Sequence, residues 1–194
     1  MPDEISLPQR DGADAKAWFY LDHRVDIETW AAQREDAAEI VEQYLRALEA
    51  PLVALADEVG ADLDMDGVDG EVYQVMGLRR ACWAHNGIND VGVVIEWERG
   101  TLLHPEGRNE WPFTAVRLSG NRDDKERWRQ LLTALAPVRK RLQGQYSNPW
   151  LYWRFETPAA NATSVDPDAL AHALLTSFRR LWDEAAPILD AAHS

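Results

Sequence analysis

Long apolar runs, paired cysteines and secretory signals are all missing from this chain. Its 194 residues include a single cysteine, Cys82, so no disulfide can form within the chain. No apolar run approaches the roughly 18 to 20 residues that a membrane-spanning helix needs. Residues 1–16 are acidic where a signal peptide would be basic and then apolar. We therefore expect a cytoplasmic protein that does not contact a membrane, in which Cys82 is a small buried hydrophobe.

Recognisable catalytic motifs are missing as well. The chain contains no Gly-x-Ser-x-Gly nucleophile elbow and no glycine-rich phosphate-binding loop. Its five histidines lack the spacing of metal ligands: His23, His85, His104, His172 and His193. The sequence therefore gives little support to nucleophilic catalysis or to a histidine-based metal centre.

Negative charge is concentrated in the first part of the chain. Residues 1–77 contain 19 Asp and Glu against 5 Lys and Arg, whereas residues 78–194 contain 14 against 15. The whole chain has a formal net charge of −13 at pH 7. A region of like charge creates a negative field that repels nucleic acid and attracts basic proteins or cations. This distribution favours a basic protein partner and makes nucleic acid an unfavourable ligand for the N-terminal region.

Length and composition indicate one globular domain. The chain is 46% hydrophobic and 27% charged, which is ordinary for a folded protein, and its length suits one domain. Residues 1–15 show no periodicity and are predicted to be a mobile N-terminal tail. Residues 16–194 are predicted to form a single α+β domain.

The strongest helical pattern lies between residues 26 and 60. Asp26 is a suitable N-cap, and apolar residues then recur every three or four positions as far as Val59. Pro51 is expected to kink this helix because proline lacks an N–H group and clashes with the preceding turn. Gly60 is expected to end it.

Two further helices are predicted nearer the C-terminus. One is expected to begin with Asn121 as its cap and to end at Gly144. The last is expected to open with Asp166 as its cap, with Pro167 at the first helical position. Its apolar stripe continues to Leu189.

The middle of the chain has the pattern of strands. Short segments rich in β-branched and aromatic residues are separated by Gly, Asn and Pro, at 72–76, 79–84, 91–98, 113–118 and 149–155. In residues 91–98 the odd positions are all apolar, whereas the even positions become acidic at the end. The predicted fold is α+β, with a central, mainly antiparallel sheet of four to five strands covered by three main helices.

Nine tryptophans form an unusually large share of the chain. Trp150, Tyr152 and Trp153 could make an aromatic platform for bases or sugars. Strand alternation, however, predicts Trp150 and Tyr152 on one face and Trp153 on the other. This split favours packing between two layers over a continuous platform.

One segment begins like a calcium-binding loop. Asp62, Asp64 and Asp66 occupy the first, third and fifth positions, and Gly67 follows at the sixth. The twelfth position, which needs a bidentate Glu, is Tyr73, and Glu71 could replace it only with a different loop geometry. We therefore expect a solvated acidic turn between a helix and a strand, and no calcium cofactor.

The order of elements after residue 78 resembles that of a known nuclease superfamily. This order resembles that of the PD-(D/E)XK superfamily. The elements concerned are strands at 83–95 and 113–118, a helix from Asp123, a Trp-rich strand at 150–155 and a closing helix at 166–189. The resemblance covers residues 78–190. The superfamily includes a restriction-associated domain that also ends in a Trp-rich strand and a closing helix. It implies a Mg²⁺-binding site built from an Asp before the second core strand and an acid-x-Lys triplet on the third.

Only part of this catalytic pattern is present. Asp90 matches the first position, but the third strand reads Thr114-Ala115-Val116-Arg117 and contains no acid. Glu96 and Glu98 offer carboxylates at the wrong end of a strand. The resemblance therefore implies a nuclease-like fold whose active site is not retained.

Three hypotheses about function remain. The first is a non-catalytic acidic interaction protein, similar to an antitoxin, an immunity protein or a regulator in bacterial defence or conflict, without a cofactor. Its acidic helix face would bind a basic protein partner through Glu35, Asp36, Glu39 and Glu42. The second is a Mg²⁺-dependent nuclease with a divergent site at Asp90, Glu96 and Glu98, and the third is an acidic DNA mimic.

Overall fold

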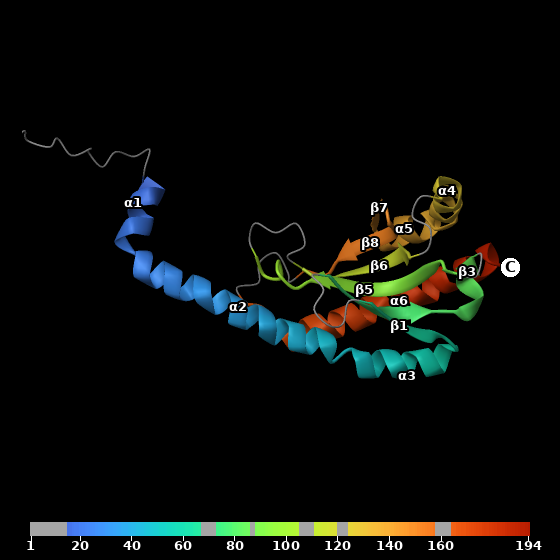
Figure 1. Cartoon of the computed structure of the whole chain (residues 1–194), viewed down its shortest axis with the longest axis horizontal. Helices are drawn as coiled ribbons and strands as arrows, with labels where there is room; N and C mark the ends of the chain where they lie inside the picture. Colours follow the sequence, from blue (N-terminus) through green and yellow to red (C-terminus); the bar gives the residue numbers. More distant parts are fainter. Residues whose placement is uncertain (1–14, 67–72, 86–87, 105–110, 120–123, 158–163) are drawn as a thin grey trace, which may run out of the picture. The chain divides into compact units, whose positions relative to one another are not determined.

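A computed structural model describes residues 15–66, 73–85, 88–104, 111–119, 124–157 and 164–194. These residues have an α+β fold, as the sequence predicts (Figure 1). The chain divides into two compact units, Met1–Ala37 and Ala38–Ser194. Of the predicted N-terminal tail, only Ala15 lies within the described residues, where it begins the first helix.

The first unit contains two consecutive helical segments. Helix α1 (Ala15–Asp22) is followed at once by α2 (Arg24–Arg46), whose residues up to Ala37 belong to this unit. The amide of His23 donates to the carbonyl of Phe19 at 3.1 Å, so the backbone stays hydrogen-bonded through the junction. None of the residues of α1 is buried. We refer to α1 and residues 24–37 of α2 as the N-terminal helices.

The second unit begins with the remainder of α2 and with α3 (Glu49–Val59). The sequence predicts one helix with a kink at Pro51. In the structure α2 ends at Arg46 and α3 begins at Glu49, so the break lies before Pro51. Pro51 then occupies the first turn of α3, where its missing N–H group breaks no helical hydrogen bond. Gly60 ends α3 as predicted, in the left-handed conformation with φ of 63°.

The main sheet has six described strands, where the sequence predicts four to five. Every neighbouring pair is antiparallel. In spatial order the strands are β1 (Asp62–Asp66), β2 (Tyr73–Arg79), β5 (Val91–Glu98), β6 (Phe113–Leu118), β8 (Trp150–Phe155) and β7 (Gln145–Ser147). Strands β1 and β7, which form the two edges, were not among the predicted strands.

The segment 79–84 is not the strand that the sequence predicts. A short 3₁₀ helix, η2 (Ala81–Trp83), interrupts it and leads into a separate small ladder of β3 (Ala84–His85) and β4 (Ile88–Asn89). The turn directs Trp83 into the core, where its ring lies 5.2 Å from that of Trp182. Cys82 is consequently exposed, and the prediction that it is buried is wrong.

The second predicted helix is divided into α4 (Lys125–Ala134) and α5 (Ala136–Leu142). Asp124 caps α4 by accepting a hydrogen bond from the amide of Arg127 at 2.9 Å. The predicted cap, Asn121, lies outside the described residues. The last helix, α6 (Pro167–Ala192), begins as predicted. The side chain of Asp166 caps it by accepting hydrogen bonds from the amides of Asp168 and Ala169.

The helices of the second unit pack on one face of the sheet. Helix α3 contacts β1 and β2, α6 contacts β5 and β6, and α4 contacts β8. The apolar face that the sequence predicts for β5 meets these helices and is buried: Val91, Val93, Ile95 and Trp97. No described helix in this chain is long and apolar enough to cross a membrane.

The opposite face of the sheet carries a second, smaller cluster. Val75, Val94, Phe113 and Ala115 are its buried members, and none of them belongs to a helix. Trp150, Trp153 and Phe155 pack against this cluster and are partly buried. Strand β5 is therefore buried on both of its faces.

Gly77 allows strands β2 and β5 to approach each other closely. A Cβ atom at this position would lie 2.1 Å from the carbonyl oxygen of Val93 and 2.7 Å from Cα of Val94. Both atoms belong to the backbone, so a strand would have to move. We predict that Gly77→Ala lowers the free energy of unfolding by about 1–3 kcal/mol. Gly100→Ala is the matched control, because no atom lies within 4 Å of its Cβ position. Urea unfolding of both variants tests this, and equal stability would contradict the prediction.

Candidate functional site

The first nuclease candidate, Asp90, is buried in an ionic cluster that joins three elements. Its carboxylate lies 2.9 Å from Nε of Arg127 on α4 and 3.3 Å from Nε2 of His193 at the end of α6. Nδ1 of His193 donates to the carbonyl of Leu189 at 2.7 Å, which orients the imidazole ring. Asp90 is only 4% exposed. We call these three side chains the Asp90 cluster, and its position indicates that it fastens the end of α6 to the sheet.

Glu96 and Glu98 lie at the other end of β5. Oε1 of Glu96 accepts a hydrogen bond from the indole of Trp150 at 2.9 Å and lies 3.7 Å from Nε of Arg117. Six residues of strand, at about 3.3 Å each, separate Asp90 from Glu96 by roughly 20 Å. A metal ion binds oxygen ligands within about 2.0–2.6 Å, so these carboxylates cannot share one ion.

Other acidic and metal-ligating side chains of the described residues are not grouped into a metal site either. Among the described residues there is no group of three or more His, Cys, Asp or Glu side chains that could hold a metal ion. The three nuclease candidates are thus not brought together. Asp90 and Glu96 are each engaged in an ion pair within the fold.

The acidic stretch 62–66 forms strand β1 and is not the predicted turn. Asp62 pairs with Arg79, and Asp64 pairs with Gly77, in the ladder with β2. Oδ1 of Asp64 lies 3.2 Å from Nη1 of Arg79. In a strand, alternate residues such as Asp62, Asp64 and Asp66 are about 6.6 Å apart along the backbone, which is unlike the tight turn of a calcium loop. The second half of the predicted loop, residues 67–72, lies outside the described residues.

The acidic partner face of α2 is shorter than the sequence predicts. Glu35 and Asp36 are exposed in the first unit, and Glu39 is exposed at the start of the second. Glu42 is buried instead. Its carboxylate lies 3.1 Å from Nη2 of Arg46 and 2.9 Å from Nε of Arg99, which is on a loop distant in the sequence. Glu42 is therefore engaged in ion pairs within the fold and is not part of the exposed acidic face.

The three aromatic residues of β8 do not divide between the faces as predicted. A bulge opposite Val116 and Arg117 moves Trp150 to the same face as Trp153, where both rings contact Phe113. The rings meet edge to face, at interplanar angles of 83° and 68°. Tyr152 lies in the helix-covered core, and burial raises its pKa above the usual value of 10. The aromatic rings thus pack on one another and do not form a stacking platform.

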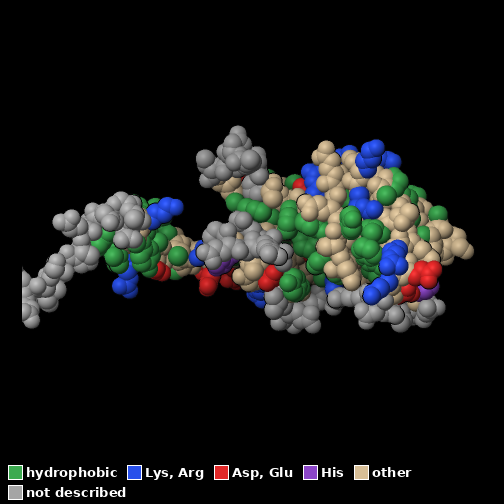
Figure 2. All heavy atoms as spheres, turned by 90° about the horizontal axis from the view of Figure 1, so that it is seen from above, with side chains coloured by type: hydrophobic (Ala, Val, Ile, Leu, Met, Phe, Trp, Pro, Cys, Tyr) green, Lys and Arg blue, Asp and Glu red, His purple; other side chains and the backbone are tan. Residues whose placement is uncertain are grey.

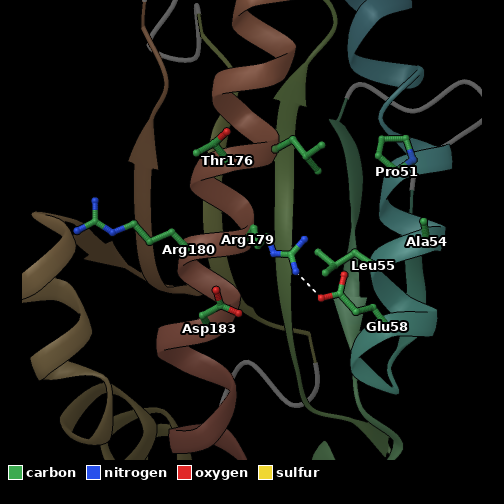
Figure 3. A pocket seen from close by; sticks show the side chains of 9 residues that line it. Pro51, Ala54, Leu55, Glu58, Thr176, Arg179, Arg180 and Asp183 are labelled. Atoms are coloured by element: carbon green, nitrogen blue, oxygen red, sulfur yellow. Dashed lines mark hydrogen bonds and ion pairs between the residues drawn. The ribbon is translucent and has the colours of Figure 1, made fainter.

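Helices α3 and α6 line an open groove with a volume of about 540 Å³, which we call the α3–α6 groove (Figure 3). Leu55, which is buried, and Leu175, which is half-buried, supply apolar side chains to it. Ala54 keeps one wall low because its side chain is short. Arg179 on α6 reaches across and bonds to Glu58 on α3, as the dashed line in Figure 3 marks. The groove thus combines an apolar lining with charged rims.

The N-terminal helices expose large apolar side chains on more than one side. The exposed fractions are 60% for Phe19, 58% for Leu21, 78% for Val25 and 77% for Trp30. Figure 2 shows hydrophobic side chains at the surface of these helices, at the left of the view. The hydroxyl of Tyr20 donates to Glu28, and this hydrogen bond raises the pKa of Tyr20. Side chains of this size usually lie in contact with other apolar groups.

The sequence of α1 contains the run Trp18-Phe19-Tyr20-Leu21. The informative signal was Leu21, because four consecutive large apolar residues point to all sides of a helix. A helix packed on one side of a domain cannot bury all of them. Such a run indicates either a fully enclosed helix or a contact with another molecule.

The chain was compared with protein-family models, with curated proteins and with solved structures, and no match was found. The similarity to the PD-(D/E)XK superfamily therefore stays a prediction from the order of elements.

The Asp90 cluster yields a stability prediction. We expect Asp90→Ala to lower the free energy of unfolding by about 3–5 kcal/mol, because it leaves the charge of Arg127 buried without its partner. Asp183→Ala on the exposed side of α6 is the control and should change stability by less than about 0.5 kcal/mol. Chemical denaturation measures both. Loss of a Mg²⁺-dependent nicking activity at unchanged stability would contradict this structural role and support the nuclease hypothesis.

Proposed function

We propose that this protein is a non-catalytic interaction protein that binds a protein partner through its N-terminal helices. The observation that carries the proposal is the exposure of Phe19, Leu21, Val25 and Trp30, each more than half accessible. Clusters of exposed apolar side chains commonly mark sites of protein association. Binding a partner would remove this surface from water, which is the main favourable contribution to association.

The charges beside these side chains suggest the chemistry of the partner. Asp22, Asp26 and Glu28 lie among the apolar residues, and Glu35 and Asp36 follow them. A helix with apolar side chains on more than one side fits an apolar groove deep enough to enclose it, and basic side chains at the rim would complement its carboxylates. The proposed partner is therefore a protein with an apolar groove and basic residues beside it.

The geometry gives less support to the divergent nuclease and to the acidic DNA mimic. A divergent nuclease needs carboxylates that share a metal ion, whereas Asp90 and Glu96 lie at opposite ends of β5. An acidic DNA mimic needs a row of exposed carboxylates, and Glu42 is withdrawn from that row by Arg46 and Arg99. The expected relation to antitoxins, immunity proteins or defence regulators stays a prediction.

The proposal can be tested with a photoreactive amino acid at Thr29, which is exposed on α2. The cross-linked partner is identified, purified and titrated against the protein. We expect Phe19→Ala/Trp30→Ala to weaken the affinity at least about ten-fold, since large aromatic side chains dominate the binding energy of many interfaces. Tyr146→Ala removes an aromatic ring that is 56% exposed elsewhere on the chain and is the control. Equal affinity of the double variant and the wild type would overturn the proposal.

Charge reversal provides an independent prediction. Glu35→Lys/Asp36→Lys should slow association with a basic partner and reduce its dependence on salt, because long-range attraction acts mainly on the association rate. Rates measured by stopped flow at several salt concentrations test this. The control is Asp57→Lys, which reverses an exposed charge on α3. The charge argument fails when both variants associate at the same rate and with the same salt dependence.

A further inference from the structure

We infer that a pocket between α4 and β7 binds a mononucleotide, with the base against two aromatic rings and the phosphate beside a lysine. The pocket has a volume of about 200 Å³ and is lined by Lys125, Trp128, Tyr146, Ser147 and Asn148. We call it the α4–β7 pocket. Its lining residues belong to the second unit, so the inference goes beyond the proposed function and does not rest on it.

Two aromatic rings form the apolar part of the α4–β7 pocket. The rings of Trp128 on α4 and Tyr146 on β7 have centroids 6.3 Å apart, and their planes are inclined at 52°. Rings at this angle form a notch in which a flat ligand stacks on one ring while its edge meets the other. The guanidinium of Arg139 on α5 lies 5.1 Å from the centre of the Tyr146 ring and helps to hold it. Helices α4 and α5 thus meet β7 at this edge of the sheet (Figure 1).

The volume of the pocket restricts the part of the ligand that enters it. A cavity of about 150 Å³ holds benzene, whereas pockets for drug-sized ligands begin at about 300 Å³. At about 200 Å³ the α4–β7 pocket accommodates one heterocyclic base, and the rest of the ligand stays outside it. Tyr146 is exposed, so a base can reach this ring from solvent without any movement of the fold.

The polar groups of the pocket favour a nucleobase over a hydrocarbon ring. Ser147 supplies a hydroxyl group and Asn148 supplies a carboxamide, and both residues are exposed. The hydroxyl oxygen of Ser147 accepts a hydrogen bond from the indole of Trp153 at 3.1 Å, so its own proton remains to be donated to a ligand. A carboxamide donates and accepts at once, which matches the paired donor and acceptor on the edge of adenine. A hydrocarbon ring would remove these groups from water without replacing their hydrogen bonds.

Positive charge beside the pocket favours an anionic ligand. Helices α4 and α5 carry six basic residues and one acidic residue, in a chain whose net charge is −13. Lys125 lines the pocket, and Arg129 lies one turn further along the same side of α4. Neither cation has an ion-pair partner in the part of the chain that the structure describes. Both are therefore available to a phosphate. The negative charge of the whole chain opposes a long polyanion more than a small one, which favours a single nucleotide.

Calorimetric titration of the full-length protein tests the site, with adenosine 5′-monophosphate (AMP) as the probe. We expect saturable binding with a dissociation constant below about 1 mM. Adenosine lacks the phosphate and ribose 5-phosphate lacks the base, so each should bind at least about ten-fold more weakly than AMP. Absence of saturation by AMP up to about 10 mM, or equal affinity for AMP and either fragment, would overturn the inference.

Variants of the lining residues locate the bound nucleotide. Tyr146→Ala should weaken AMP binding about ten-fold, because stacking on an aromatic ring contributes to the binding of a base. Tyr73→Ala is the matched control and should bind AMP as the wild type does. It removes an exposed ring from β2, which lies four positions from β7 in the order of strands. Equal affinities of the two variants would overturn the assignment to this pocket.

Charge reversal tests the phosphate contact. Lys125→Glu should weaken AMP binding at least about ten-fold, whereas Lys125→Arg, which keeps the positive charge, should stay within about three-fold of the wild type. Thermal unfolding shows whether each variant keeps the wild-type fold. The phosphate assignment fails when folded Lys125→Glu binds AMP as tightly as Lys125→Arg.

A single strand of nucleic acid would supply the same base and phosphate, and one comparison separates the two sources. A ten-residue oligodeoxyadenylate is titrated beside deoxyadenosine 5′-monophosphate. We expect the strand to bind no more than about ten-fold more tightly, which is the advantage of offering ten equivalent nucleotides. An advantage of more than about a hundred-fold that declines steeply with salt would overturn the free nucleotide in favour of a strand.

Discussion

Burial of β5 on both faces is the constraint on which the rest of this fold depends. Every residue from Val91 to Trp97 is buried, toward the helices on one face and toward the smaller cluster on the other. A charged group next to such a strand must be paired or hydrogen-bonded by groups from other elements. Arg127 and His193 do this for Asp90, and Trp150 and Arg117 do it for Glu96. These contacts tie α4, α6, β6 and β8 to the same strand, so residues that resemble catalytic acids in the sequence stabilise the sheet.

Patterns that depend on neighbouring residues were predictable from the sequence. The apolar face of β5 follows from strict alternation. The C-terminal end of α3 follows from Gly60, and the start of α6 follows from Asp166 with Pro167. Features that depend on distant partners were not predictable. An Asp-rich segment has low strand propensity and forms β1 only because β2 offers it a ladder and Arg79 offers a counter-charge. The bulge in β6 and β8, which moves Trp150 to the other face, likewise arises from the pairing of two strands.

The candidate binding surfaces also combine features that depend on neighbouring residues with features that depend on distant ones. The exposed acids Glu35 and Asp36 could be placed on a helix face from their spacing alone, but the burial of Glu42 depends on Arg99, which lies 57 positions later in the chain. The α3–α6 groove could not be predicted, because it depends on how far apart two helices lie on the sheet. The aromatic run of α1 was visible in the sequence, whereas its exposure became apparent only from the packing around it.

The acidic edge strand β1 has a consequence for how the molecule behaves in a crowded solution. Unpaired edges of sheets offer backbone hydrogen bonds to any other exposed strand and so lead to open-ended stacking into fibres. In β1 the exposed carboxylate of Asp62 would lie close to the same charge on a second identical edge, and the repulsion opposes such pairing. The other edge, β7, is only three residues long and offers few hydrogen bonds. Both features oppose the growth of the sheet by pairing of its edges.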